Sequence, residues 1–356
     1  MSLEVRIKKK LGKFLLDVAF ESDGVLGLLG ASGCGKSMTL KCIAGVEKPD
    51  EGRIVLDGRV LFDSEKHIHL SPQERKVGYL FQDYALFPNM TVAQNIQCGT
   101  KDKKEVQAYL KRFDLEQVQK LYPAQLSGGQ KQRTALARML AAKPQALLLD
   151  EPFSALDNFL KARMERELMN VLDDFAGPVV FVSHDRNEAY RLTGTIAVME
   201  QGSIVDISEK HELFKAPKTL AATLLTGCKN VTRVERLPDG SYMALDWGIR
   251  LRAPKTEEKD TEYTYAGFRA HYAVPVEKTE NEDTVPVNRI ECEIWREIED
   301  TFSIVVQLYP KGLQTRTEYS LLTYETGKEE RKKQKEKYGD HLCLAIPEDA
   351  VIWMER

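Results

Sequence analysis

Short apolar runs alternate with amphipathic stretches over the first two thirds of the chain. Val25–Leu29 is an apolar run that leads into glycines and then into a pattern with helical periodicity. Further along, Ala146–Leu149 and Val179–Val182 are continuously apolar, which is typical of strands buried on both faces of a parallel sheet. This alternation predicts an α/β fold with a parallel core.

Two hairpins and a helical insertion complete the pattern. Ile54–Leu56 and Val60–Phe62 flank an Asp-Gly turn, and Ile196–Met199 and Ile204–Ile207 flank a Gln-Gly turn. Between the strands of the core, residues 83–143 have a mostly helical pattern. We therefore expect a helical subdomain inserted between two core strands.

The pattern changes after about Gly227. Residues 230–353 are rich in Thr, Tyr, Val and charged residues, with alternating runs such as Phe302–Leu308. This predicts a smaller, mainly antiparallel β domain of the OB-like kind, so we expect two domains, 1–227 and 228–356.

The charged stretch 327–340 bears on nucleic-acid binding. Acidic residues interleave with its lysines, and Tyr338 is its one aromatic residue. These features favour a solvated loop or helix over a nucleic-acid surface.

Composition narrows the class of protein. The chain has 356 residues, of which 42% are apolar and 29% charged, as in ordinary globular proteins. Its net charge of −3 gives no global attraction to nucleic acid or anionic membranes. The six cysteines show no CxxC spacing, which favours a reducing cytosol over a disulfide framework or a zinc site. No apolar run approaches the roughly 20 residues that span a bilayer, so another chain would have to do so.

The clearest chemical signal is Gly30–Ser37, which matches GxxxxGK[ST] between a predicted strand and a predicted helix. Its glycines let the backbone approach phosphates, and the helix N-terminus supplies free N–H groups. Lys36 is expected to neutralise charge on the β- and γ-phosphates, and Ser37 to bind Mg²⁺ through its hydroxyl. Cys34 is interpreted as a tolerated small residue, with a redox sensor as the alternative. The predicted nucleotide contacts here are Gly30, Ser32, Gly33, Cys34, Gly35, Lys36, Ser37 and Met38.

An acidic pair ends the apolar strand that follows the helical insertion. Asp150 at its tip is expected to hold Mg²⁺, and Glu151 to act as general base on an attacking water. Because the carboxyl ends of parallel strands form the ligand edge of such a sheet, His184 and Gln82 are expected on the same rim. We predict that His184 contacts the γ-phosphate and that Gln82 senses Mg²⁺ or water. A strand-capping acidic pair and a structural histidine are the alternatives.

A second anion cradle stands at Leu126–Gln130, whose sequence is LSGGQ. A serine and two glycines there precede a long predicted helix. Together with Gly30–Ser37 and Asp150–Glu151, this segment resembles the ATP-binding subunits of ABC transporters over about residues 1–225.

The resemblance implies an ABC-type P-loop NTPase core that binds ATP and Mg²⁺. It also implies two subunits packed head to tail, with each ATP held between the phosphate loop of one copy and Ser127, Gly128, Gly129 and Gln130 of the other. It assigns Gln82 to the Q-loop, Asp157 to the D-loop beside the nucleotide, and His184 to the switch histidine. The family usually stacks an aromatic residue near the N-terminus on adenine, which points to Phe14; a core phenylalanine on a strand is the alternative.

The spacing separates this chain from relatives with other functions. Lys36 and Ser127 are 127 − 36 = 91 positions apart, which leaves no room for a long coiled coil, and only one motif set is present. The run Phe81–Ile96 looks like that of binding-protein-dependent importers. The short segment from Leu11 and the segment Thr226–Asn230 look most like molybdate, tungstate or sulfate importers.

The C-terminal domain resembles those that bind oxyanions in the same importers. Gly267–His271 is similar to a Gly-Ile-Arg-Pro-Glu stretch of such domains, with Ala270 and His271 replacing Pro and Glu.

The resemblance therefore implies an ATP-hydrolysing motor of an oxyanion importer at the cytoplasmic face of the membrane. It implies a homodimer, permease subunits docked near Gln82–Asn95, an indirect external solute-binding protein, and no nucleic acid. The alternatives are an importer of iron, polyamine or sugar, a non-transport ABC ATPase, and a regulatory protein with a vestigial ATPase.

Overall fold

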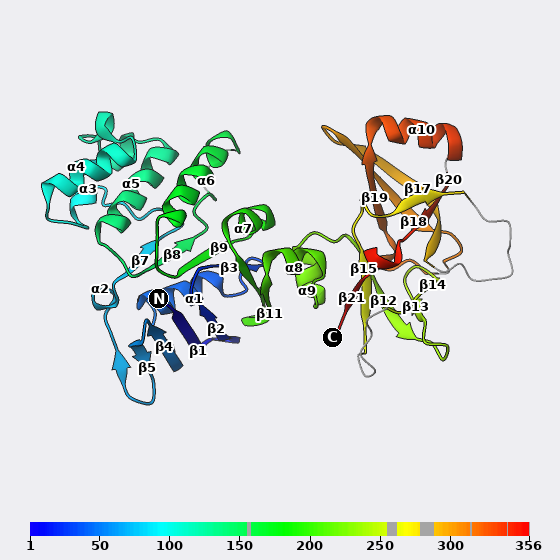
Figure 1. The fold of residues 1–356 in the computed structure, drawn as a ribbon, viewed down its shortest axis with the longest axis horizontal. Helices are drawn as coiled ribbons and strands as arrows, with labels where there is room; N and C mark the ends of the chain where they lie inside the picture. The colour runs from blue at the N-terminus through cyan, green and yellow to red at the C-terminus, as the bar shows by residue number, and fades with distance from the viewer. Residues whose placement is uncertain (155–157, 255–261, 278–287, 314, 340, 356) are drawn as a thin grey trace. The chain divides into compact units, whose positions relative to one another are not determined.

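The computed structural model describes residues 1–154, 158–254, 262–277, 288–313, 315–339 and 341–355. The chain divides into two compact units, Met1–Lys210 and His211–Arg356 (Figure 1). None of the helices formed by the described residues is both long and apolar enough to cross a bilayer.

The first unit is built on a sheet that has 11 strands in the described residues, in the order β6-β5-β4-β1-β2-β11-β10-β3-β9-β8-β7. The neighbours from β10 to β7 run parallel, as the apolar runs predict. The strands are β1 (Leu3–Leu11), β2 (Phe14–Ser22), β3 (Val25–Gly30), β4 (Glu51–Leu56), β5 (Arg59–Asp63), β6 (Ile68–His69), β7 (Val77–Leu80), β8 (Ala146–Asp150), β9 (Val179–Ser183), β10 (Thr195–Glu200) and β11 (Ser203–Glu209).

Both predicted hairpins are present. In the first, β4 and β5 pair antiparallel, with Asp57 and Gly58 at φ 49° and 76°. In the second, β10 and β11 pair antiparallel, with Gln201 and Gly202 at φ 45° and 90°. Positive φ at both central residues gives a turn that matches the twist of the flanking strands, and this explains the Gly in each pair.

Two apolar cores share the central strands. Leu147 and Leu149 of β8 belong to one cluster, and Ala146 and Leu148 belong to another. Side chains of a strand alternate between its faces, so the two clusters lie on opposite sides of the sheet. This two-sided burial explains why β8 reads as a continuous apolar run.

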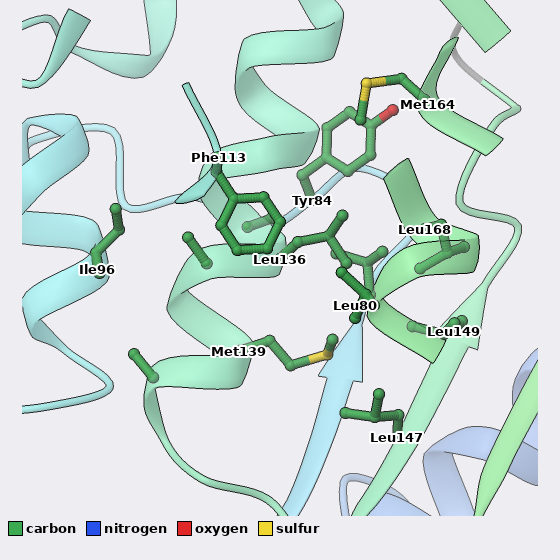
Figure 2. Packing of buried hydrophobic residues seen from close by; sticks show 14 of the residues in the cluster. Leu80, Tyr84, Ile96, Phe113, Leu136, Met139, Leu147, Leu149, Met164 and Leu168 are labelled. Atoms are coloured by element: carbon green, nitrogen blue, oxygen red, sulfur yellow. The ribbon is translucent and has the colours of Figure 1, made fainter. Parts of the chain in front are cut away.

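Helices cover the sheet: α1 (Lys36–Ala44), α2 (Pro72–Arg75), α3 (Val92–Gln97), α4 (Lys103–Arg112), α5 (Gly128–Ala141), α6 (Asn158–Asp173) and α7 (Arg186–Leu192), with 3₁₀ turns at Glu116–Val118 and Pro123–Gln125. The helices α3, α4 and α5 fall between β7 and β8, inside the predicted 83–143 insertion. Figure 2 shows Leu136 and Met139 of α5 and Leu168 of α6 around Leu80 and Leu149 of the sheet. The insertion therefore shares its apolar core with one face of the sheet.

The second unit carries two five-stranded sheets in its described residues, ordered β14-β13-β12-β15-β21 and β16-β20-β17-β18-β19, and their neighbouring strands pair antiparallel. The expected mainly antiparallel β domain is confirmed. Its elements are α8 (Lys210–Lys215), α9 (Leu220–Leu225), β12 (Asn230–Arg236), β13 (Tyr242–Ala244), β14 (Ile249–Leu251), β15 (Tyr265–Phe268), β16 (Val274–Val276), β17 (Arg289–Glu299), β18 (Ser303–Pro310), β19 (Leu322–Gly327), α10 (Lys328–Tyr338), β20 (His341–Ala345) and β21 (Ile352–Met354), with 3₁₀ turns at Glu318–Ser320 and Glu348–Ala350.

The charged stretch 327–340 forms the helix α10. Arg331 is buried and donates to the Glu297 carboxylate at 2.7 Å, while Gln334 donates to the Tyr324 hydroxyl at 2.9 Å. The polar residues of α10 thus partly serve to fix the helix to the sheet.

The compact units divide after Lys210, earlier than the domain boundary expected at 227. Arg269, just after β15, donates to the Thr226 carbonyl at 2.9 Å and also to the Phe214 carbonyl. The backbone N–H of Glu355 donates to the Lys218 carbonyl at 3.2 Å. These bonds attach α8 and α9 to the β unit. The boundary of the ATPase domain as a functional unit stays a prediction.

Candidate nucleotide-binding site

The predicted phosphate loop lies between β3 and α1. Gly33 and Gly35 have φ of 81° and 108°, a region that residues with a side chain rarely adopt. A Cβ at Gly35 would lie 2.7 Å from Leu16 Cδ1, and one at Gly30 would lie 2.5 Å from the Met199 carbonyl oxygen. Backbone conformation and close packing therefore both require glycine in this loop.

Lys36 lies over this loop and is only 5% exposed. Its ammonium group donates to the carbonyls of Gly30 at 2.7 Å and Ala31 at 2.9 Å. Cys34 Sγ lies 3.8 Å from the same nitrogen, and Cys34 is buried, which favours the tolerated small residue over a redox sensor. The loop thus joins a positive charge to the N-terminus of α1, the combination that attracts phosphate.

Other predicted contacts of the loop differ in accessibility. Ser32 and Gly33 are exposed at its tip, whereas Met38 is half-buried against the apolar core that includes β3. Phe14 is also half-buried, and a Cβ at Gly35 would lie 3.3 Å from Phe14 Cζ. Phe14 thus lies beside the phosphate loop, and its contact with adenine stays a prediction. Asp157 lies outside the described residues.

Asp150 ends β8 beside this loop. Ser37 Oγ donates to Asp150 Oδ1 at 2.8 Å, and the Tyr79 hydroxyl donates to Asp150 Oδ2 at 2.9 Å. Burial raises the pKa of Asp150, and the two hydrogen bonds oppose that rise. A hydroxyl and a carboxylate are hard oxygen donors, the kind that Mg²⁺ prefers, so the residues fit the predicted metal.

Tyr79 was not identified from the sequence. It lies on β7, where it pairs in register with Leu148 of β8, and it reaches Asp150 across the two strands. The one sequence feature that pointed to Tyr79 as a site residue is its place in a strand, three residues before Gln82.

Glu151, Gln82 and His184 meet at the ends of three neighbouring strands. Glu151 Oε2 lies 3.2 Å from His184 Nδ1 and 3.5 Å from Gln82 Nε2. The Glu151 backbone has φ 44°, and its N–H donates to the Val182 carbonyl at 3.1 Å. The His184 side chain is 61% exposed, against 20% for Glu151. A half-buried carboxylate next to an imidazole and an amide can accept a proton from a positioned water.

Ser127 caps the N-terminus of α5. Its hydroxyl accepts from the Gln130 N–H at 3.3 Å, and its own N–H donates to Gln130 Oε1 at 2.9 Å, which forms a capping box. Gly128 and Gly129 open the helix, and a Cβ at Gly129 would lie 3.0 Å from Leu160 of α6. Within the described parts of the chain, no hydrogen bond or ion pair joins this cradle to the phosphate loop. In the described structure the segment Ser127–Gln130 is therefore separate from the phosphate loop, and anion binding at either place stays a prediction.

A glycine loop between β3 and α1, with carboxylates at the tip of β8 two strands along the sheet, defines the class of P-loop ATPases. Residues 15–154 match the family model described as ABC transporter. The solved dimeric ATP-binding cassette MJ0796, in a post-hydrolysis state with ADP and Pi, is 27% identical with a TM-score of 0.50 over 59% of this chain and 99% of that one.

Three relatives are similar over about 60% of the chain. The probable sulfate/thiosulfate import ATP-binding protein CysA of Chlorella vulgaris is 40% identical over 63% of this chain and 97% of its own. The molybdenum import ATP-binding protein ModC of Paramagnetospirillum magneticum is 40% identical over 60% of this chain and 61% of its own. The putrescine transport ATP-binding protein PotG of Escherichia coli is 42% identical over 61% of this chain and 59% of its own. The chain belongs to the ABC transporter family, as an ATP-binding subunit of the importer type.

Proposed function

We propose that this ATPase drives an oxyanion importer, and that two copies close around two ATP molecules. The observation that carries the proposal is the rim cluster of Glu151, Gln82 and His184 beside the phosphate loop. It supplies a base next to the place where the loop would hold a γ-phosphate.

Each residue of the site has a role in this proposal. Lys36 exchanges its bonds to the loop carbonyls for bonds to the β- and γ-phosphates. Ser37 and Asp150 hold Mg²⁺, with Gln82 near it; the metal, when bound, neutralises charge on the phosphates. Glu151 accepts the proton of the attacking water, and His184 contacts the γ-phosphate.

The separate cradle at Ser127–Gln130 supports a head-to-tail homodimer. The N-terminus of α5 offers a second place where an anion can bind, and within the described residues no hydrogen bond joins it to the phosphate loop of the same chain. The phosphate loop of a second copy would bring an anion. The dimeric state of the solved relative supports this arrangement. In it, Asp157 would lie near the nucleotide and Phe14 would stack on adenine.

A permease is the proposed partner of the segment Gln82–Asn95, at the cytoplasmic face of the membrane. Phe87 and Met90 are both exposed in this loop and offer apolar side chains to a partner. Asn95 is buried and binds the loop from within, accepting from the Phe87 N–H at 2.9 Å and donating to the Met90 carbonyl at 3.0 Å. The loop is therefore held in one shape for docking. An external solute-binding protein would act through the permease.

The names of the relatives point to two kinds of transported solute, an oxyanion and a polyamine. Import proteins named for sulfate or molybdenum favour an oxyanion. PotG, named for putrescine, favours a polyamine as the alternative cargo. Reconstitution with the permease and its binding protein distinguishes them: we expect sulfate or molybdate, and not putrescine, to stimulate ATP hydrolysis.

The β unit is proposed to bind an oxyanion and slow import when supply is high. Equilibrium dialysis of the whole chain against molybdate and sulfate tests this, with saturating ADP to occupy the phosphate loop. Failure of both anions to bind would contradict the regulatory role and leave the motor function intact.

Replacing Glu151 by Gln tests hydrolysis itself. E151Q keeps the shape and removes the base, so ATP binding should persist while phosphate release stops. The control E4Q changes an exposed glutamate on β1 and should hydrolyse ATP like the parent chain. Parent-like activity in E151Q would refute the assignment. Stimulation by nucleic acid or ribosomes would instead favour a non-transport ATPase.

A further inference from the structure

Lys161 of α6 binds two carboxylates next to the candidate switch histidine. Its ammonium lies 2.7 Å from Asp185 Oδ2 and 2.5 Å from Glu188 Oε1. The other oxygen of Glu188 accepts from Ser183 Oγ at 2.6 Å. Lys161 and Asp185 are mostly buried and Glu188 almost wholly so, so water screens this network weakly.

The network fixes the backbone on both sides of His184. Ser183 Oγ accepts from the Asp185 N–H at 2.9 Å, and Asp185 caps α7 by accepting from the Asn187 N–H at 2.8 Å. The His184 ring itself is mostly exposed, with Glu151 Oε2 at 3.2 Å. With so little packing around the ring, its position depends on the backbone that Lys161 holds.

The charge of Lys161 is maintained by this arrangement. Burial alone would lower the pKa of Lys161, but hydrogen bonds to Asp185 and Glu188 raise it above the ordinary value. The Lys161 ammonium therefore stays charged through neutral pH.

The residue before Lys161 contacts the other anion cradle. Leu160 packs on Gly129 of α5, where a Cβ would lie 3.0 Å from Leu160 Cδ1 and 3.3 Å from Cδ2. Gly129 belongs to the Ser127–Gln130 cradle. Closely packed interiors transmit displacements, so a shift of the α5 N-terminus moves Leu160 and with it Lys161.

We propose that Lys161 is a positioning residue that couples the Ser127–Gln130 cradle to His184. In the proposed dimer these two parts of one chain serve different ATP molecules. Binding of one ATP at the α5 N-terminus would then move His184 into position for hydrolysis of the ATP held by the phosphate loop of the same chain. The inference rests on the proposed function.

The test compares two ion pairs between the same helices. K161M removes the contact next to His184. R191M removes the ion pair between Arg191 of α7 and Glu165 of α6, in which the Arg191 guanidinium donates to the Glu165 carboxylate at 2.8 and 3.0 Å. This pair joins the same two helices but contacts neither residue next to His184. K161R keeps the charge at position 161. All are made in the whole chain, with phosphate release measured against ATP concentration.

We expect K161M to lower kcat about 10- to 100-fold, because small misplacements of a reacting group cost up to about 10²-fold. Its KM for ATP should stay within about 2-fold, since His184 acts mainly on the hydrolytic step. K161R should recover most of the rate, and R191M should match the parent chain. The Hill coefficient for ATP should fall from above one in the parent toward one in K161M, which a purely structural defect would not cause.

Equal loss of kcat in R191M and K161M would overturn the proposal, as would a parental rate or a parental Hill coefficient in K161M. A parent chain that fails to hydrolyse ATP would instead refute the proposed function. If K161M melts well below R191M, the test moves to K161M/E188Q, which removes the buried carboxylate that K161M leaves unpaired. The same loss of kcat and of cooperativity is expected there, and its absence overturns the proposal.

Discussion

Replacing Tyr79 by phenylalanine should destabilise the first unit and weaken Mg²⁺-dependent ATP binding. The Tyr79 hydroxyl donates to Asp150 Oδ2 at 2.9 Å, while Ser37 serves Oδ1. The Tyr79 ring lies 4.1 Å from that of Phe81 between centroids, a contact that phenylalanine preserves. Y79F therefore isolates one hydrogen bond to a carboxylate that is only 5% exposed.

The expected magnitude follows from that bond. A hydrogen bond to a charged group contributes about 1.5–3 kcal/mol to the free energy of unfolding. For a unit of this size, about 2–4 °C in Tm accompanies each kcal/mol, so a loss of roughly 3–12 °C is expected at pH 7.

The loss should depend on pH with a defined sign. Burial already raises the pKa of Asp150 above 3.8, and loss of a donor raises it further. The ionised carboxylate is the form that needs the donor. Destabilisation is therefore complete above the folded-state pKa of Asp150 and shrinks as the pH falls through it.

Scanning calorimetry of the whole chain measures this effect, following the transition that ATP shifts upward. Y84F is the matched control, because the Tyr84 hydroxyl makes only a 3.4 Å bond to the Pro152 carbonyl. It should lose about 1 kcal/mol or less. Equal losses in Y79F and Y84F, or a loss that grows in acid, would show that the Tyr79–Asp150 hydrogen bond does not stabilise the unit.

Three further outcomes are expected. R75K should lower the free energy of unfolding by about 2–4 kcal/mol, measured by urea titration. The reason is that one ammonium cannot replace the guanidinium bonds to the Cys42 and Ile43 carbonyls at the end of α1. A decrease below about 1 kcal/mol would contradict this. S127A should cost about 1 kcal/mol through the lost cap and weaken ATP-dependent dimerisation in sedimentation, with unchanged dimerisation as the opposing result. R269A should expose residues 211–227 to limited proteolysis, because it loses the bond to the Thr226 carbonyl; equal cleavage in the parent chain would argue against that anchor.

Local patterns were sufficient for the parallel core strands and the two hairpins of the first unit, while its ABC-type core was implied by the family resemblance. The phosphate loop, the buried β8 and the Asp57-Gly58 hairpin each depend on residues that are neighbours in sequence. Gln82 and Glu151 are 69 positions apart, but both were expected at the same edge of the sheet because each follows the carboxyl end of a parallel strand.

Side-chain pairings between distant elements could not be predicted. Tyr79 meets Asp150 only because β7 and β8 pair in a particular register. Lys161 meets Glu188 because α6 and α7 pack together, and Arg269 reaches Thr226 across 43 positions. No periodicity or motif specifies these contacts, which depend on tertiary packing.

In the proposed dimer, one ATP is held by Gly30–Ser37 of one copy and Ser127–Gln130 of another. Two variants test it in the E151Q background, in which hydrolysis cannot release the nucleotide: K36M, with a defective loop, and G128D, with a repulsive charge in the cradle. ATP retained after gel filtration is measured for each variant and for their mixture. We predict that only the mixture retains ATP, because only mixed dimers contain an intact pair of cradles. Full retention by G128D/E151Q alone would contradict this arrangement.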